Sequence, residues 1–309
     1  MKRWTMMVWM GALGLTACAN GVGEGPAGAT TTGLDVDSGG SGGQGAGLAQ
    51  GQDEPWVSIE HSSLSTCGIT EGGEVACLQV SASQLPAGDD FVQVELAGGW
   101  PGMGCALRAD GEAVCFAPSD ASQRLVDEVP AVELTVLAGR DFLVEGQVCG
   151  LDADGAVHCW GDVQKPPPED EVFVDLDGGG GDFCGLREDG SVLCWEAFSG
   201  RRLEEPPEGD WETVTVGDEY ACVREGTTVE CWGRLPGDEA PDEPLVAVEA
   251  GEWSVCGLGT DGAARCWGSN GWGQNNVPNQ TFQALSPAEM TVAGLRTDGA
   301  VEVWGASFR

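Results

Sequence analysis

Short runs in which apolar and polar residues alternate recur along the whole chain, and most of them end in glycine. "FVQVELAG" at 91–98 and "AVELTVLAG" at 131–139 show the pattern clearly. Alternation with a period of two predicts a β-strand with one buried face, and the glycine marks the turn that ends it. Seven such runs occur, at residues 55–61, 91–98, 131–139, 172–179, 211–217, 245–251 and 281–287.

A second repeated segment follows each run and predicts a β-hairpin. The copy at 149–161 reads "CGLDADGAVHCWG". A three-residue loop that ends at Gly155 would place Leu151 opposite Val157 and Cys149 opposite Cys159, because glycine adopts the left-handed conformation that this loop requires. Related copies begin at residues 67, 105, 149, 184, 222, 256 and 293.

Two copies depart from this pattern, and both indicate that the cysteines pair across their own hairpin. The copy at 222 is one residue shorter, which predicts a two-residue loop with Gly226 first, yet its cysteines still face each other. In the copy at 293, Ala293 and Val303 replace both cysteines together. Opposed cysteines on antiparallel strands lie within disulfide reach. We expect six disulfides: Cys67–Cys77, Cys105–Cys115, Cys149–Cys159, Cys184–Cys194, Cys222–Cys231 and Cys256–Cys266.

The spacing of possible ligands does not favour a metal or a cofactor. Zinc sites use clustered Cys and His ligands, whereas this chain has two histidines, His61 and His158, and no C-x-x-C. "DADG" (152–155) and "DLDG" (175–178) lack the spaced oxygens and the distant glutamate of an EF-hand calcium loop. We interpret their Asp and Gly residues as turn formers.

Strand, turn and hairpin together give three or four antiparallel strands per unit, repeated at steps of 34 to 44 residues. Regular short strands at this period indicate a β-propeller. We therefore predict an all-β fold, a seven-bladed β-propeller of short three- to four-stranded antiparallel blades. A tryptophan follows the second cysteine position in most copies, and we expect it to pack between blades; these residues are Trp160, Trp195, Trp232, Trp267 and Trp304.

The motif "CGLxxDGxVxCWG", preceded by "VxAG", resembles the repeat of the regulator of chromosome condensation superfamily. "WGSNGWGQ" (267–274) is similar to that family's most recognisable segment. The short, cysteine-bearing repeats resemble secreted bacterial members, which include the second type of β-lactamase inhibitory protein. The resemblance covers 56–309 and implies a seven-bladed propeller and, by analogy, an inhibitor of a penicillin-recognising enzyme. Nothing matches the face with which the nuclear protein engages its small GTPase and chromatin, so nucleotide exchange is not expected.

The N-terminus predicts export. Residues 1–17 have a basic start, a short apolar run and small residues before Cys18, as a secretory signal does. "LTAC" (15–18) resembles the lipobox of bacterial lipoproteins, which implies lipidation of Cys18. Residues 18–55 are rich in Gly, Ser and Ala and predict a disordered tether, and 56–309 form the propeller. We expect the protein at the bacterial cell envelope, held to the membrane through lipid alone and facing the periplasm or the exterior.

Charge restricts the partners. The formal net charge is −36, which opposes nucleic acid because phosphate binding needs a basic footprint. Acidic connectors at 164–171, 201–210 and 234–244 would crowd one rim of a propeller. That rim is interpreted either as a solvated edge or as a docking face for a basic protein or for divalent ions. We expect a monomer that binds another protein, either a basic one or an envelope enzyme.

Three tryptophans lie near turns, outside the repeat pattern. Trp100, Trp253 and Trp272 are candidate partner contacts, since aromatic residues supply interface anchors. Exposed tryptophans also suit a carbohydrate-binding surface module, which is the main alternative. A sialidase-like hydrolase would need an arginine cluster and a nucleophilic tyrosine, and Tyr220 is the single tyrosine. We expect no catalysis and no catalytic residues.

Overall fold

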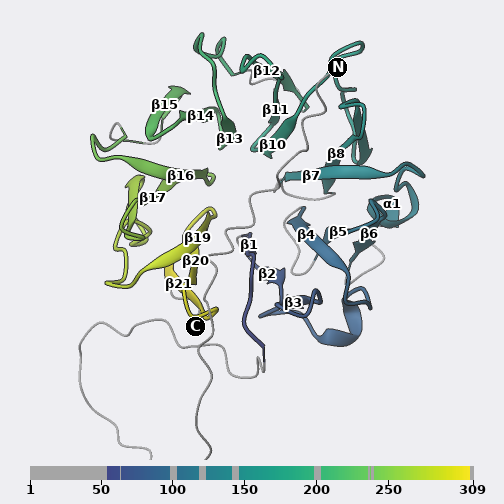
Figure 1. The fold of residues 1–309 in the computed structure, drawn as a ribbon, viewed down its shortest axis with the longest axis horizontal. Coiled ribbons are helices and arrows are strands. Elements are labelled where there is room, and N and C mark those ends of the chain that lie inside the picture. Colours follow the sequence, from purple (N-terminus) through teal and green to yellow (C-terminus); the bar gives the residue numbers. More distant parts are fainter. Residues whose placement is uncertain are drawn as a thin grey trace, which may run out of the picture. The chain divides into compact units, whose positions relative to one another are not determined.

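The computed structural model describes residues 54–62, 64–97, 103–117, 123–140, 146–197, 203–235, 237 and 240–306. These residues form seven antiparallel sheets of three strands, each built from strands that are consecutive in the chain. The sheets are arranged as blades around a centre (Figure 1). The predicted all-β, seven-bladed propeller is therefore confirmed, with three described strands in every blade.

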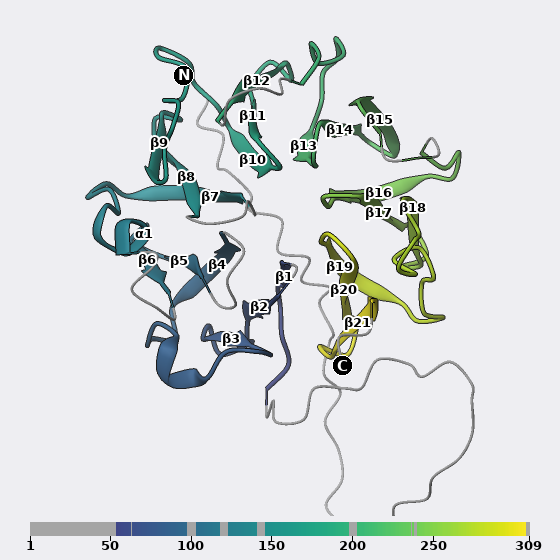
Figure 2. The same ribbon diagram turned by 180° about the vertical axis from the view of Figure 1, so that it is seen from behind.

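The first strand of each blade lies nearest the centre, as the view from behind also shows (Figure 2). The inner strands are β1 (Glu60–His61), β4 (Phe91–Leu96), β7 (Leu134–Arg140), β10 (Asp175–Gly179), β13 (Thr213–Val216), β16 (Leu245–Ala250) and β19 (Phe282–Pro287). The middle strands are β2 (Thr66–Ile69), β5 (Gly104–Arg108), β8 (Gln147–Asp152), β11 (Asp182–Leu186), β14 (Tyr220–Glu225), β17 (Ser254–Gly259) and β20 (Thr291–Arg296). The outer strands are β3 (Val75–Cys77), β6 (Ala113–Phe116), β9 (Val157–Gly161), β12 (Val192–Glu196), β15 (Thr228–Gly233), β18 (Ala264–Gly268) and β21 (Val301–Gly305).

Helices play a small part in the described chain. A 3₁₀ turn covers Ala82–Gln84, and one short helix, α1, covers Gln123–Asp127. Neither was expected from the sequence pattern. No helix among the described residues is long and apolar enough to cross a membrane. The predicted signal segment 1–17, Cys18 and most of the tether lie outside the described residues.

The hairpin register agrees with the sequence prediction. Leu151 lies opposite Val157 and Cys149 lies opposite Cys159, with Gly155 at a φ of +79° in the loop. In the shortened copy the loop holds two residues, and Gly226 has a φ of +59°. All six expected disulfides form, and their Cα–Cα distances lie between 3.9 and 4.1 Å.

Each disulfide packs in the apolar core between its own blade and the next. The Cys105–Cys115 bridge, for example, shares a core with Trp160 of the following blade, whose side chain is 2% exposed. The residue after the second cysteine position fills the same place at the other junctions, as Phe116, Trp195, Trp232, Trp267 and Trp304 show. The expectation that these tryptophans pack between blades is confirmed.

Neighbouring blades are also joined by a repeated backbone hydrogen bond. The N–H of Phe91 donates to the carbonyl oxygen of Gly73, the hairpin glycine of the blade before it, at 3.0 Å. The N–H of Phe173 donates to the carbonyl oxygen of Gly155 in the same way, at 2.9 Å. The apolar residue near the start of each inner strand is therefore held at hydrogen-bond distance from the hairpin turn of the preceding blade.

Candidate binding surface

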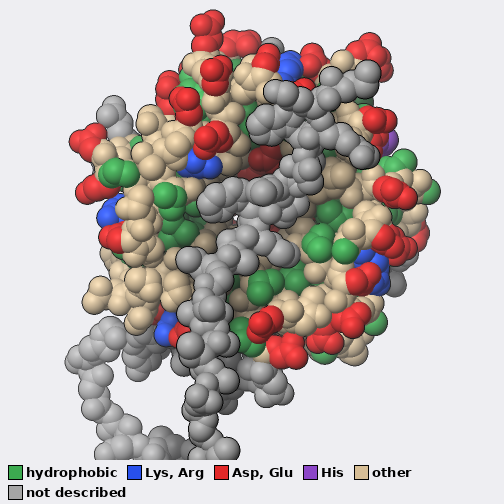
Figure 3. All heavy atoms as spheres, viewed as in Figure 1, with side chains coloured by type: hydrophobic (Ala, Val, Ile, Leu, Met, Phe, Trp, Pro, Cys, Tyr) green, Lys and Arg blue, Asp and Glu red, His purple; other side chains and the backbone are tan. Residues whose placement is uncertain are grey.

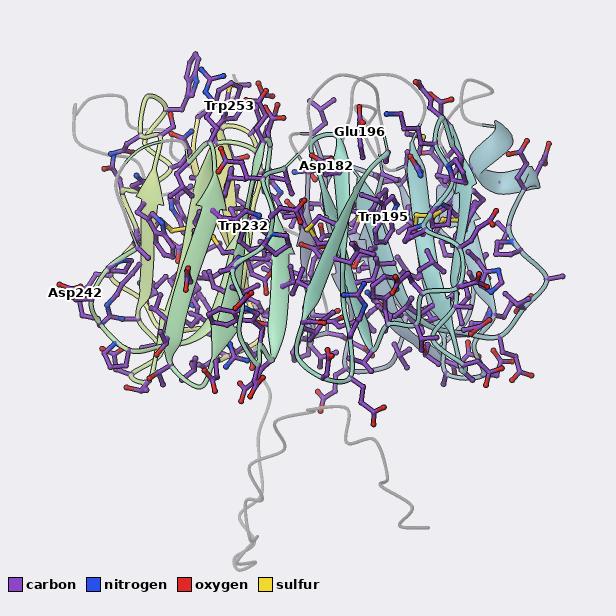
Figure 4. The ribbon with its side chains drawn as sticks, turned by 90° about the horizontal axis from the view of Figure 1, so that it is seen from above. Asp182, Trp195, Glu196, Trp232, Asp242 and Trp253 are labelled. Carbon is purple, nitrogen blue, oxygen red and sulfur yellow. A yellow bond between two sulfur atoms is a disulfide. The ribbon has the colours of Figure 1, made fainter. Side chains whose placement is uncertain are left out.

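Trp253 and Trp272 come from neighbouring turns of blade 6 and remain open to solvent. Trp253 lies between β16 and β17 and is 44% exposed, while Trp272 follows β18 and is 60% exposed. The N–H of Ser269 donates to the carbonyl oxygen of Trp253 at 2.9 Å, which joins the two turns. Trp253 lies at the end of the blades where Asp182 and Glu196 also lie (Figure 4). We call Trp253 and Trp272 the tryptophan surface.

The loop that carries Trp272 is held by side-chain amides. Asn270 Oδ1 accepts from the N–H of Asn275 at 3.0 Å, and Gln274 Oε1 accepts from the N–H of Trp272 at 3.0 Å. Gln274 is 1% exposed, and its carbonyl oxygen accepts from Trp304 Nε1 at 2.7 Å. The loop is thus fixed to the next blade, while Trp272 points to solvent at a defined place. This accounts for the "WGSNGWGQ" segment, which the sequence presents once.

Of the three tryptophans predicted as partner contacts, the structure brings two together. The turn of Trp253 and the loop that carries Trp272 are joined by the hydrogen bond from Ser269 to Trp253. Trp100 lies outside the described residues. The sequence pattern identified all three as irregular positions, but it did not show that the turns of two of them are joined.

Carboxylates surround the outer edge of the propeller. Figure 3 shows Asp and Glu side chains around the periphery of the face in view, with few Lys and Arg among them. Lys165 Nζ lies 2.5 Å from Glu196 Oε2, and Arg234 Nη1 lies 3.2 Å from Glu219 Oε2, so these cations are already paired. The three connectors predicted to be acidic contribute exposed carboxylates to this acidic rim: Glu169, Asp170, Glu204, Glu205, Glu208, Asp210, Asp242 and Glu243.

A second group of carboxylates lies between the inner strands. Glu95, Asp175, Asp177 and Glu249 line a cavity of about 300 Å³ among β4, β7, β10, β13 and β16. Two of them join adjacent blades, because the N–H of Gly139 donates to Glu95 Oε2 at 3.3 Å and the N–H of Val216 donates to Asp177 Oδ2 at 2.7 Å. These acids were not recognised as a group from the sequence, since they lie on different repeats.

Glu249 occupies the equivalent position in blade 6 but has no equivalent hydrogen bond. Glu95, Asp177 and Glu249 each lie opposite the first cysteine of their blade. The donor in the next blade would be the residue after Ser286, which is Pro287 and has no N–H. The carboxyl group of Glu249 therefore faces the cavity without the backbone donor that its counterparts have.

The crowding of these groups changes their proton affinity. Burial, together with the nearby Asp177, raises the pKa of Glu95 to about 8. Burial also raises the pKa of Asp177 to about 7 and that of Asp175 to about 6. The pKa of Glu249 lies well above its usual range because of burial and the charges of Asp177, Asp175 and Glu95. These carboxyl groups line a cavity between the inner strands, where the charged form loses part of its hydration.

The turn interpretation of the two Asp-Gly segments is correct for one of them. Asp152 Oδ1 accepts from the N–H of Asp154 at 2.9 Å and from that of Ala156 at 3.0 Å, as turn chemistry requires. Asp175 and Asp177, in contrast, lie on strand β10 rather than in a turn, because the inner strand of blade 4 continues through "DLDGG". Within the described ranges, no group of three or more His, Cys, Asp or Glu side chains is arranged to hold a metal ion.

Tyr220 is part of the core. Its side chain is 0% exposed, and its hydroxyl lies 2.6 Å from the carbonyl oxygen of Gly251 and 3.1 Å from that of Ser254, both in the next blade. Burial raises the pKa of the phenol further above its usual range. A hydroxyl that is buried, protonated and held by backbone carbonyls joins two blades and is not accessible to a substrate.

Comparison with known proteins identifies the fold. No family model matches the chain. No curated protein matches it either. Among solved structures, the ectodomain of the Physcomitrella patens receptor kinase CR4 is similar with a TM-score of 0.68 and 23% identity, over 81% of this chain and 73% of that one. The CRINKLY WD40 ectodomain of the Arabidopsis thaliana receptor kinase ACR4 has a TM-score of 0.66 and 24% identity, over 81% and 94%.

Yeast Prp20 extends the comparison to the family that the repeats resemble. Prp20p from Saccharomyces cerevisiae, a yeast RCC1, has a TM-score of 0.54 and 14% identity, over 82% of each chain. Its structure was described together with its binding to Gsp1p and histones. At these identities the likeness concerns the fold. The chain is a seven-bladed β-propeller similar in fold to RCC1 and to the ectodomains of plant receptor kinases.

Proposed function

We propose that this protein is a non-catalytic, lipid-anchored scaffold of the bacterial envelope that binds a basic protein through its tryptophan surface. The observation that carries the proposal is the placement of Trp272, 60% exposed, on a loop held by side-chain amides beside Trp253. Tryptophans anchor many protein interfaces. A loop that is already ordered loses little further entropy when a partner binds.

The charge of the chain defines the kind of partner. A net charge of −36 and the acidic rim favour a partner of opposite sign, since complementary charge raises association rates and suppresses unsuitable partners. Nucleic acid and a second copy of this chain are both repelled. An envelope enzyme with a basic surface is a partner of the expected kind.

The proposed location rests on the disulfides and on the N-terminal segment. Six disulfides are typical of proteins in oxidising compartments. The segment before Cys18 supports export and lipidation. Metabolic labelling with a fatty acid tests the anchor: the wild-type protein should take up the label and sediment with membranes, and Cys18→Ala should do neither. A wild-type chain without label would contradict the anchor while leaving the binding proposal intact.

Absence of catalysis is part of the proposal. Tyr220, the residue that a sialidase-like reaction would use, is enclosed between blades and bonded to backbone carbonyls. Two of the carboxyl groups around the cavity, Glu95 and Asp177, accept hydrogen bonds from backbone N–H groups of the next blade. Both observations favour structural roles for the side chains that would be the best candidates for catalysis.

Site-specific photocrosslinking tests the binding surface. A photoreactive residue at position 272 of the full chain should capture a basic protein in intact cells. The matched control is position 172, because Val172 is similarly exposed, at 57%, and lies beside the hairpin glycine Gly155 on the opposite face. With purified components, Trp253→Ala and Trp272→Ala should weaken the complex, and about 0.5 M salt should weaken it further. Equal crosslinking at both positions, or binding indifferent to both substitutions, would refute the proposal.

A surface carbohydrate is the second candidate, because amide side chains accompany the exposed rings. Asn270 Nδ2 lies 3.3 Å from Asn276 Oδ1, close in sequence to Trp272. Sugars stack on aromatic rings and bond to amides, and neither contact depends strongly on salt. Glycan-array binding that Trp272→Ala removes and that persists at high salt would favour this candidate over the basic protein.

A further inference from the structure

The blades of this propeller have three strands, one fewer than the four of a typical propeller blade. Each outer strand therefore has one edge that no other described strand pairs with. In blades 2 and 3 the short helix α1 contacts the outer strands β6 and β9. The edge of β18 in blade 6 has a different environment.

A groove of about 510 Å³ runs along the edge of β18. Its floor consists of the four consecutive residues 264–267, so the strand backbone itself lines it. One wall is the connector from blade 5, with Pro241 and Glu243, and the other is residues 275–277 of the connector to blade 7. The groove thus lies where a fourth strand would lie.

The disulfide geometry shows which backbone groups face this groove. The Cα atoms of Cys256 and Cys266 are 4.1 Å apart, the short separation of a non-hydrogen-bonded antiparallel pair. In such a pair the N–H and C=O groups point away from the partner strand. The N–H and C=O of Cys266 therefore point to the groove, and no described residue bonds to them. The free edge is bounded at its start by an antiparallel bridge between Ala263 and Thr281. It ends at Gly268, whose carbonyl oxygen accepts from Asn275 Nδ2 at 3.1 Å.

The groove borders the acidic connector at 234–244 and adjoins the tryptophan surface. Glu243 belongs to one wall. Asp242, which precedes it in the sequence, lies at the outer edge of the propeller (Figure 4). Arg265 is the basic residue of the floor, and its Nη1 lies 3.4 Å from Asp261 Oδ1. Asn275 connects the groove to the loop that carries Trp272. Two copies of this chain would each carry a net charge of −36, so edge-to-edge pairing between copies is disfavoured.

We propose that the groove along β18 binds an extended, basic segment of a partner protein as the fourth strand of blade 6. The inference rests on the proposed function and names the mode of recognition. Strand addition gains affinity from main-chain hydrogen bonds, and specificity from the side chains that alternate along the added segment. Lys or Arg residues of that segment would face Glu243 and the acidic connector that carries it, and its flank would reach Trp272.

Synthetic peptides of alternating Val and Lys, blocked at both ends, test the mode of binding with the full chain. The matched control has the same sequence with N-methyl groups on alternate residues, which keeps the charge and removes the donors of a β-ladder. The unmodified peptide should bind and slow hydrogen exchange at the Cys266 amide, and N-methylation should weaken binding at least about tenfold. Equal binding of both peptides, no binding, or protection of other amides in place of Cys266 would overturn the proposal.

Two variants locate the site on the protein. Asn276→Trp should fill the groove and weaken peptide binding about tenfold, whereas Asn279→Trp, at an exposed position that does not line the groove, should not. Identical binding of the two variants would also contradict the proposal.

Trp253→Ala and Trp272→Ala distinguish a failure of strand addition from a failure of the proposed function. If they abolish capture of the cellular partner while the Cys266 amide stays unprotected, strand addition is wrong and the tryptophan surface stands. If these substitutions leave capture of the cellular partner unchanged and the peptide does not protect the Cys266 amide, both proposals fail.

Discussion

The N–H of Trp56 donates to the carbonyl oxygen of Gly299 at 3.1 Å, and this bond closes the ring of blades. It joins the start of the propeller to its last hairpin, with the geometry that Phe91 and Gly73 show between neighbouring blades. Trp56 is 1% exposed and shares a core with Ala293 and other apolar residues of blade 7. The junction without a disulfide is therefore held by a buried tryptophan.

Trp56→Ala should lower the free energy of unfolding by about 3–5 kcal/mol, because a large buried ring is removed from a core that cannot collapse to fill the space. Urea unfolding of the full chain measures it. Trp253→Ala, at an exposed position, should change stability by no more than about 0.5 kcal/mol. Equal effects of the two substitutions would show that the closing junction contributes little.

A single blade should tolerate the loss of its disulfide at a defined cost. Blade 7 carries Ala293 and Val303 at the two cysteine positions and keeps the same register. Cys149→Ala combined with Cys159→Val should therefore keep the fold and lose about 2–3 kcal/mol, the expected effect of a disulfide that closes a short loop. Urea unfolding under non-reducing conditions provides the measurement. A disordered product, seen as lost near-ultraviolet circular dichroism, would contradict this expectation.

The central carboxyl groups predict that stability falls as pH rises above neutrality. The pKa of Glu95 is about 8 in the fold instead of about 4.5, and that of Asp177 is about 7, so the folded state holds protons that the unfolded chain releases. Stability from these groups is present at low pH and is lost as pH rises through the folded values. The melting temperature should thus decrease between pH 6.5 and 8.

Glu249→Gln tests the same group directly. The substitution removes a like charge from the cavity, and it should raise the melting temperature at pH 8 and flatten its decline with pH. Glu225→Gln is the matched control, because it removes one charge at an exposed hairpin position. If the two variants behave alike, general charge repulsion, and not the cavity, causes the pH dependence.

His61 should have the opposite influence at lower pH. Its Nε2 lies 2.7 Å from Thr291 Oγ1 across the closing junction, and burial lowers its pKa from 6.5 to about 4. The unfolded chain therefore binds the extra proton first, and the stability that neutral His61 contributes is lost as pH falls from 6.5 towards 4. The stability difference between wild type and His61→Gln should shrink between pH 7 and pH 5. A difference that grows would show that the imidazole is charged in the fold.

The hairpins and the binding surface differ in how far sequence could predict them. The pairs Cys149–Cys159 and Leu151–Val157 lie within one repeat, so loop length and alternation determine their register. Trp253 and Trp272 were identifiable as irregular positions, but their proximity depends on the bond from Ser269 to Trp253. "DLDG" was assigned to a turn because Asp and Gly favour turns, and burial between inner strands prevailed over that local preference.

The number of repeats, the strand–hairpin unit and all six disulfides could be predicted from the sequence, because the hairpin contacts join residues about ten positions apart within one repeat. The contacts between residues of different blades became visible only in the folded structure. The N–H of His61 donates to Ser286 Oγ, which is 225 positions away. Glu249 has no backbone donor because the residue at the corresponding place in the next blade is Pro287, which has no N–H. A groove lies along the edge of β18 because two connectors between blades lie on either side of this strand. Ring closure places these residues together, and no local pattern in a single repeat encodes that.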